Sequence, residues 1–212
     1  MSEGFFVVLE GPEGAGKSTL AVTLAARLRA LGHEPVMVRE PGGTVAAEAL
    51  RKELLHADRQ WTPERELLYF VTARADLVGL VIRPALAAGK IVLSDRYDLT
   101  TMAYQAAGRG LPLPMVVWVN DAATGGLRPD LTLILDVLPE TGSARQVSSG
   151  KSQDRLDREP LDFHQRVAAR YRAETGPGVI HLDATLPPDE LAGRAWSALL
   201  AARPALAPAG VR

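Results

Sequence analysis

The sequence has 212 residues, 24 basic and 25 acidic side chains, a net charge of −1 and no cysteine. This length suits one domain, and the balanced charge disfavours a nucleic-acid-binding protein, which typically presents a basic face. The lack of cysteine excludes disulfides, a thiol nucleophile and thiolate metal ligands. The first apolar run, Phe5 to Leu9, is too short for a signal peptide or a membrane span. We therefore expect a cytoplasmic protein with no nucleic-acid or membrane partner.

Five short apolar runs predict the strands of a parallel β-sheet. They are rich in Val, Ile, Leu or Phe and show little polar alternation, which is typical of parallel strands covered on both faces. The runs are Phe5–Glu10, Pro35–Arg39, Ile91–Asp95, Leu131–Val137 and Val179–Asp183.

The longer segments between these runs have helical spacing. Leucine recurs every three or four residues after Leu20, and Gly32 stands where a helix C-cap belongs. Thr62 and Pro63 favour a helix start, and we expect that helix to run to Ala88. Strands alternating with helices predict a three-layer α/β sandwich with right-handed crossovers.

The chain shows no internal repeat and no second domain. We expect one domain over residues 1–202 and a disordered tail over residues 203–212. The interior stretch Ser148–Gln153 is polar and is expected to be flexible.

The segment from Gly11 to Ser18 fits the pattern G-x-x-x-x-G-K-[ST] and joins a predicted strand to a predicted helix. Its glycines let the backbone approach phosphates closely, and the helix N-terminus that follows favours anions. Lys17 would neutralise the β- and γ-phosphates, and the hydroxyl of Ser18 would contact Mg²⁺. The motif predicts an ATP site composed of Gly11, Pro12, Glu13, Gly14, Ala15, Gly16, Lys17, Ser18 and Thr19.

Two carboxylates near this site need an interpretation. Asp95 ends the third predicted strand, so it would lie at the same sheet edge as Ser18 and could share the Mg²⁺ site; alternatively it caps the next helix. Glu13 places a negative charge in a loop that attracts anions. It would either hold another group, such as a sugar hydroxyl, or point to solvent.

Further motifs follow the strands. They are Arg39-Glu40-Pro41-Gly42-Gly43-Thr44, the pair Phe70 and Arg74 on one helix face, Asp95-Arg96-Tyr97, Ala103-Tyr104-Gln105 and Asp154-Arg155. Together with the phosphate loop, these motifs resemble thymidylate kinase of the bacterial type in which a lid supplies basic residues. The resemblance extends from Phe6 to about Leu200. The resemblance implies a nucleoside monophosphate kinase-like fold with sheet order 2-3-1-4-5. It also implies ATP-dependent phosphorylation of dTMP to dTDP with Mg²⁺, and a homodimer formed through long helices.

The resemblance also implies how dTMP is held. Phe70 would stack on thymine, and Arg74 would hydrogen-bond a base carbonyl. Arg39, Arg51 and Arg96 would clamp the monophosphate, for which a planar guanidinium is well suited. Without the resemblance, Phe70 would be read as a core residue and Arg51 could equally be a solvated helix residue.

The remaining substrate contacts are implied in the same way. Thr101 and Gln105 would complete the base edge, Tyr104 would favour deoxyribose by crowding the 2′ position, and Glu13 would hold the 3′-hydroxyl.

Catalysis would need a cation but no general base, because the acceptor phosphate is already anionic. The expected lid spans about residues 142–160, and its candidate cations are Arg145, Lys151, Arg155 and Arg158. Lids of this type often carry further arginines after the position of Arg145, whereas this chain has none from Gln146 to Gly150. The cluster could also be a salt-bridged surface turn. The expected catalytic residues are Lys17, Arg96, Arg145 and Arg155.

Two other functions fit parts of the sequence. One is a kinase for another nucleotide or for a deoxynucleoside, which the phosphate-clamping arginines disfavour. The other is a nucleotide-driven switch that signals through a partner, which leaves the acceptor-site motifs unexplained.

Overall fold

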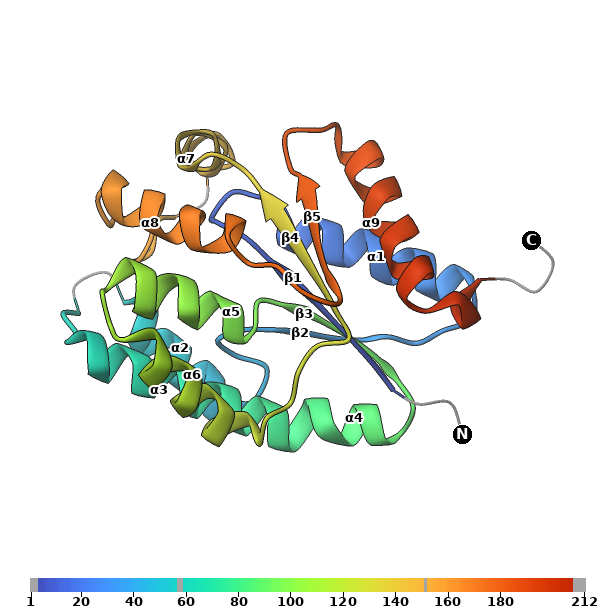
Figure 1. The fold of residues 1–212 in the computed structure, drawn as a ribbon, viewed down its shortest axis with the longest axis horizontal. Coiled ribbons are helices and arrows are strands. Elements are labelled where there is room, and N and C mark those ends of the chain that lie inside the picture. The colour runs from blue at the N-terminus through green and yellow to red at the C-terminus, as the bar shows by residue number, and fades with distance from the viewer. Residues whose placement is uncertain (1–3, 57–58, 151, 208–212) are drawn as a thin grey trace.

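The computed structural model describes residues 4–56, 59–150 and 152–207. Its centre is one five-stranded parallel sheet in the order β2-β3-β1-β4-β5 (Figure 1). The strands are β1 (Phe5–Glu10), β2 (Val36–Arg39), β3 (Ile91–Asp95), β4 (Leu131–Asp136) and β5 (Val179–Asp183). The predicted strands and their order are confirmed, with β2 beginning one residue later and β4 ending one residue earlier than expected.

Helices cover both faces of the sheet (Figure 1). On one face, α1 (Lys17–Ala30) and α9 (Pro188–Ala202) pack together and bury the largest apolar core. The remaining helical elements are α2 (Val45–Leu55), α3 (Pro63–Leu77), η1 (Val78–Ile82), α4 (Arg83–Ala87), α5 (Asp98–Thr101), η2 (Met102–Gly108), α6 (Leu113–Thr124), α7 (Pro139–Ser148), α8 (Leu161–Arg172) and η3 (Pro204–Leu206). Of these, α3 to α6 and α8 lie on the other face of the sheet (Figure 1).

The long helix expected between Thr62 and Ala88 is present, with one irregular turn. The Thr62 hydroxyl caps its start by accepting from the amide of Arg65 at 3.3 Å. The π-helical turn η1 lies just before Pro84. Because proline lacks an N–H and its ring collides with the preceding turn, regular α-helical bonding cannot continue through that position.

The expected disordered tail is corrected in its first half. Pro204–Leu206 forms a 3₁₀ turn, and the side chain of Leu206 is buried against the α1–α9 core, so apolar burial holds this part of the chain in place. Residues 208–212 lie outside the described residues. Within residues 4–56, 59–150 and 152–207, no helix is long and apolar enough to cross a membrane.

The sheet brings the functional motifs to one edge. All five strands are parallel, so their carboxyl ends lie on the same side. In the register of the sheet, Asp95 stands beside Leu9 of β1 on one side and Arg39 of β2 on the other. The glycine-rich motif that follows β1 therefore begins next to the end of β3, and the end of β2 lies one strand further along the same edge.

Candidate active site

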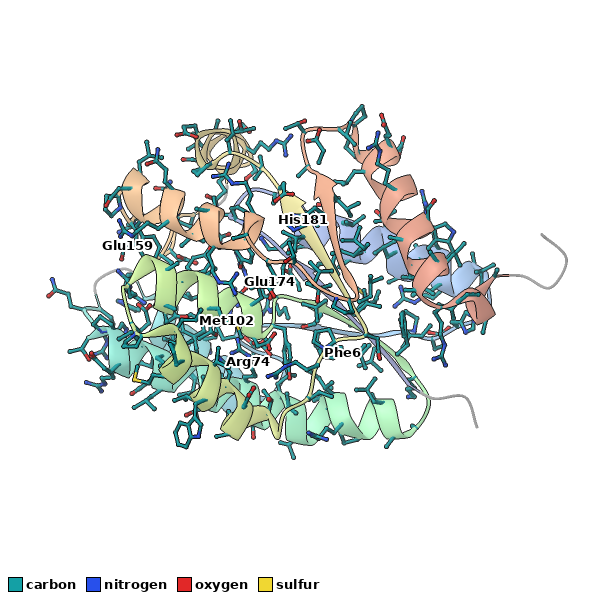
Figure 2. All side chains as sticks on the ribbon, in the orientation of Figure 1. Phe6, Arg74, Met102, Glu159, Glu174 and His181 are labelled. Atoms are coloured by element: carbon teal, nitrogen blue, oxygen red, sulfur yellow. The ribbon has the colours of Figure 1, made fainter. Side chains whose placement is uncertain are left out.

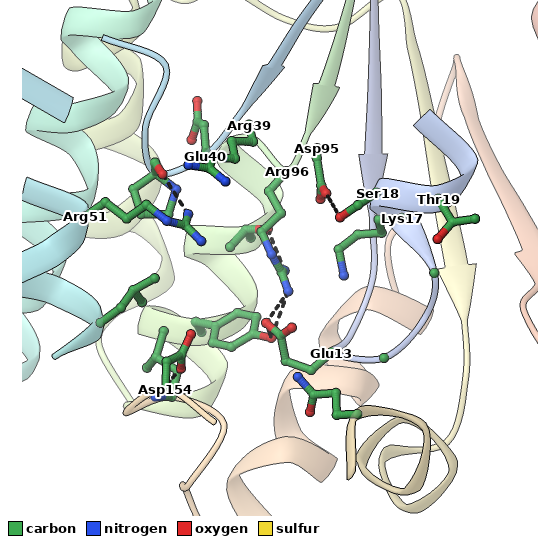
Figure 3. Close-up of a pocket in the computed structure, with 18 of the residues that line it drawn as sticks. Glu13, Lys17, Ser18, Thr19, Arg39, Glu40, Arg51, Asp95, Arg96 and Asp154 are labelled. Carbon is green, nitrogen blue, oxygen red and sulfur yellow. Dashed lines mark hydrogen bonds and ion pairs between the residues drawn. The ribbon is translucent and has the colours of Figure 1, made fainter. Parts of the chain in front are cut away.

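A cavity of about 480 Å³ opens at this edge of the sheet (Figure 3). It is lined by the loop that follows β1, the ends of β2 and β3, and residues from α2, α3, η2 and α7. The expected site residues among its lining are Glu13, Gly14, Gly16, Lys17, Ser18, Thr19, Arg39, Arg51, Phe70, Asp95, Arg96, Tyr104 and Arg145. Motifs far apart in the sequence thus share one cavity.

The loop from Gly11 to Ser18 has the backbone that its glycines predict. Gly14 and Gly16 have φ angles of 69° and 93°, which are costly for residues with a Cβ. Gly14 also packs on the backbone of α7, where a Cβ would come within 2.1 Å of the Gly142 carbonyl oxygen. Lys17 folds over the loop and donates from Nζ to the carbonyls of Gly11 (2.9 Å) and Pro12 (2.7 Å).

Ser18 and Asp95 are neighbours, as expected. The Ser18 hydroxyl donates to the Asp95 carboxylate at 2.5 Å. A hydroxyl and a carboxylate are hard oxygen ligands, and Mg²⁺ in nucleotide sites is commonly held by one or two such groups plus phosphates and water. The donor set therefore fits Mg²⁺.

Three arginines face the cavity from different elements. Arg51 on α2 donates to the carbonyl of Pro41 at 2.8 Å, and Arg39 at the end of β2 contacts the Glu48 carboxylate at 3.3 Å. Burial lowers the pKa of Arg51, and repulsion from the guanidinium groups of Arg39 and Arg96 lowers it further. A site in which like charges repel in this way favours an anion that neutralises them.

Arg96 is held in an unusual conformation directly after β3. Its φ of 77° lies in the left-handed region, which non-glycine residues adopt at a cost. The side chain is fixed by an ion pair with Glu13 and by a donation from Nη1 to the Gly11 carbonyl at 3.2 Å. Burial alone would lower the pKa of Arg96, but Glu13 holds it well above its usual value. Lys17 and Arg96 both point into the cavity (Figure 3).

Glu13 does not simply point to solvent. It pairs with Arg96 and accepts a hydrogen bond from the Tyr104 hydroxyl at 3.1 Å. The carboxylate in the anion-binding loop is thus balanced by a buried cation, which reduces its repulsion of phosphates.

The residues expected to read the base fall into two groups. Phe70 lines the cavity, whereas Arg74, Thr101 and Gln105 are buried and do not line it. Arg74, on α3, lies among the helices that cover one face of the sheet (Figure 2). It donates to the Glu40 carboxylate at 2.6 Å and to the Thr101 hydroxyl at 2.8 Å.

The expected lid cations are also separated. Arg145 on α7 lines the cavity and donates to the Ala184 carbonyl at 2.9 Å. Arg155 does not line it: this side chain is bound to the Glu66 carboxylate and the Leu54 carbonyl. Arg158 is exposed, and Lys151 lies outside the described residues.

Sequence reasoning missed two acidic residues that position the site. Glu10, at the end of β1, is fully buried and accepts hydrogen bonds from the backbone amides of Tyr97 and Thr100. Glu66 on α3 binds Gln105 and two arginines. The signal for Glu10 was available, because a carboxylate that ends an apolar strand next to Gly11 needs buried partners.

The lowered pKa of Lys17 predicts how the free energy of unfolding depends on pH. Burial, followed by repulsion from Arg96, lowers the pKa of Lys17 to about 8 from its usual value of 10.5. Between these two pH values the unfolded chain binds more protons than the folded chain, so the free energy of unfolding rises with pH. We expect the wild type to gain stability relative to Lys17→Met, by up to about 1 kcal/mol per pH unit.

Urea unfolding of both proteins at several pH values between 8 and 10.5 measures this difference. The other titrating lysines are common to both proteins and cancel. Parallel stability curves for the two proteins would contradict the assignment of a lowered pKa to Lys17.

Comparisons with known proteins agree with this geometry. The thymidylate kinase family model matches residues 9–194. The chain is 45% identical over 203 residues to thymidylate kinase of Deinococcus radiodurans, covering 94% of this chain and 98% of that protein. It is 47% identical to thymidylate kinase of Thermomicrobium roseum, with 91% and 93% of the two chains covered.

A solved structure is similar as well. The crystal structure of thymidylate kinase from Ehrlichia chaffeensis superposes with a TM-score of 0.74 at 26% identity, covering 93% of this chain and 99% of that chain. Because the family model and the relatives span nearly the whole chain, and the ATP-binding loop, arginines and Phe70 share one cavity, this chain belongs to the thymidylate kinase family.

Proposed function

We propose how the residues of this site carry out the reaction of the family, the ATP-dependent phosphorylation of dTMP to dTDP. One observation carries the proposal: Arg39, Arg51 and Arg96 line the same cavity as the ATP-binding loop. A loop for a nucleoside triphosphate beside a second cluster of phosphate-binding groups is the arrangement that direct phosphoryl transfer between two nucleotides needs.

The three arginines hold the monophosphate of dTMP. Its second pKa is about 6, so at neutral pH the attacking oxygen is already an anion and needs no general base. The ATP phosphates lie along the backbone amides of the loop, with Lys17 released from the Gly11 and Pro12 carbonyls to contact them. Aligned substrates and neutralised charge supply the catalysis.

Ser18 and Asp95 hold Mg²⁺, directly or through water. When bound, the ion neutralises charge on the ATP phosphates. The Ser18–Asp95 contact keeps both oxygens at the cavity wall, ready to bind the cation.

The nucleoside of dTMP lies against the Phe70 wall. The Phe70 ring stacks on thymine. Arg74, Thr101 and Gln105 are buried behind this wall, so the role that the family resemblance suggests for them, reading the base edge, requires the base to insert past Phe70. Tyr104 and Glu13 are joined at 3.1 Å. From that position Tyr104 crowds the ribose 2′ position and Glu13 holds the 3′-hydroxyl.

Arg145 is the lid residue best placed to act on the transferring phosphoryl group. It lines the cavity from α7, the helix that touches the ATP-binding loop through Gly14 and Gly142. Arg155 binds Glu66 and Leu54 instead, which supports a structural role for it. A guanidinium on Arg145 can contact donor and transferred phosphates together.

Base selectivity tests the proposed function. We expect ADP formation from ATP and Mg²⁺ with dTMP, modestly slower reaction with dUMP, and much slower reaction with dCMP or purine monophosphates. A missing methyl group costs only about 1 kcal/mol, whereas a mismatched polar edge costs far more. The measurement is kcat/KM for each monophosphate, with a deoxynucleoside as a further acceptor. Equal values for dTMP and dCMP would refute the base site, and ATP hydrolysis independent of any acceptor would favour a nucleotide switch.

The lid assignment is tested by alanine substitution. Arg145→Ala should lower kcat by roughly 10²-fold or more and leave KM for dTMP nearly unchanged, because the interaction forms in the transition state. Arg155→Ala and Arg158→Ala should lower kcat less. Steady-state kinetics decide between them. If Arg155→Ala proves the most damaging, or if none of the three lowers kcat tenfold, Arg145 is not the catalytic cation.

An exposed apolar surface supports a homodimer. Among the described residues, exposed large hydrophobic side chains recur on α3, η1 and α6, with Trp118 71% and Leu80 67% exposed. Such side chains are typical of the centre of a protein interface. We propose that two copies pair through this face, and we retain the cytoplasmic location as a prediction.

Sedimentation tests the dimer. Trp118→Glu should shift the protein towards monomer, because a charge would be buried in the interface. Val22→Glu is the control, since Val22 is 59% exposed but lies on α1, on the opposite face of the sheet. An unchanged sedimentation coefficient for Trp118→Glu, or the same shift with both variants, would contradict this interface.

A further inference from the structure

A buried carboxylate, Glu66, connects three segments beside the proposed base site. It lies on α3 with no exposed surface. Its Oε1 accepts from Gln105 Nε2 at 2.7 Å and from Arg109 Nε at 3.1 Å. Its Oε2 accepts from Arg109 Nη2 at 3.0 Å and from Arg155 Nη2 at 2.6 Å. Four donors thus converge on one carboxylate.

These contacts set the charge of Glu66. Burial alone would raise its pKa, but the hydrogen bonds and positive charges of Arg109 and Arg155, with the bond from Gln105, hold it below the usual value. An ionised carboxylate can only accept hydrogen bonds. Gln105 must therefore turn its NH₂ group to Glu66, and this fixes its amide orientation by chemistry.

The other end of the same amide has no partner. Gln105 Oε1 is buried and accepts no hydrogen bond from the described residues. Buried polar atoms normally have partners, because removing them from water without one is costly. An acceptor held in a fixed direction and left open is therefore available to a ligand donor.

The helix geometry places Glu66, the partner of this amide, one turn before Phe70. Glu66, Phe70 and Arg74 are spaced four residues apart and share one face of α3. Glu66 binds Gln105. Arg74 binds the hydroxyl of Thr101, which precedes Gln105 by about one helical turn. Two polar pairs therefore bracket the ring on which the base is proposed to stack.

We propose that Glu66 is a specificity-positioning residue, which holds the Gln105 amide so that its oxygen, and not its NH₂ group, is presented to the base. That oxygen accepts from the N3–H of thymine or uracil. Cytosine has an unprotonated N3, which is itself an acceptor and is rejected. This inference rests on the proposed function, because it assumes that a pyrimidine stacks on Phe70.

The test replaces Glu66 by its isosteric amide. In the Glu66→Gln variant the side-chain oxygen is held at the Oε2 position by Nη2 of Arg109 and of Arg155. The NH₂ group then takes the place of Oε1, where the bond from Arg109 Nε is lost. That group donates to Gln105, whose amide then rotates and presents its own NH₂ to the base. We expect kcat/KM for dTMP relative to dCMP to fall by about tenfold or more.

Two controls separate positioning from structural damage. Glu66→Asp keeps an acceptor-only carboxylate and should retain the preference for dTMP even where kcat falls. Glu159 lies in the turn before α8 (Figure 2) and forms the other ion pair of Arg109, at 2.6 Å. Glu159→Gln weakens that pair without touching Gln105, so it should leave the ratio of kcat/KM for dTMP to that for dCMP unchanged.

The outcomes distinguish the two hypotheses. If the wild type does not prefer dTMP to dCMP, the proposed base site itself is wrong. If the wild type prefers dTMP and folded Glu66→Gln keeps the same ratio, the role of Glu66 is overturned. If thermal melts show that Glu66→Gln is unfolded, Gln105→Met removes the acceptor directly: a lost preference supports the proposal, and a retained preference overturns it.

Discussion

The site depends on one buried carboxylate, that of Glu10 at the end of β1. It accepts hydrogen bonds from the Tyr97 amide at 2.8 Å, the Thr100 hydroxyl at 2.6 Å and the Tyr171 hydroxyl at 3.1 Å. Burial raises the pKa of Glu10, and such a group needs partners to be tolerated in the core. These bonds tie α5 and α8 to the strand that precedes the ATP-binding loop. They also hold the chain directly after Arg96, which supports the left-handed backbone of this residue.

The cavity concentrates charge at a cost to the folded state. Lys17 and Arg96 repel each other, Arg51 is destabilised by neighbouring guanidinium groups, and Glu13 compensates only part of this charge. In the proposed site, anionic substrates would relieve this repulsion, so part of their binding free energy would come from electrostatic repulsion already present in the unliganded protein.

Two arginines of the expected lid differ because of their surroundings. Arg145 belongs to α7, which touches the ATP-binding loop through a close contact between Gly14 and Gly142. Arg155 instead binds Glu66 on α3, behind the cavity wall and near the proposed base site. Movement of α7 would therefore affect phosphates bound at the loop, whereas the turn containing Arg155 would act on the proposed base site through Glu66.

The amino-acid sequence by itself determined the five strands, the ATP-binding loop and the neighbourhood of Ser18 and Asp95. These depend on local periodicity, on a contiguous motif and on the rule that parallel strands end at one edge. Only the tertiary structure decided that Arg74 is enclosed behind the cavity wall and that Arg155 binds Glu66. Arg74 pairs with Glu40, 34 positions away, and Arg155 pairs with Glu66, 89 positions away. The charges alone would allow many other partners. Which pair forms depends on how α3 packs against its neighbours, because side-chain contacts of that kind have no local pattern in the sequence.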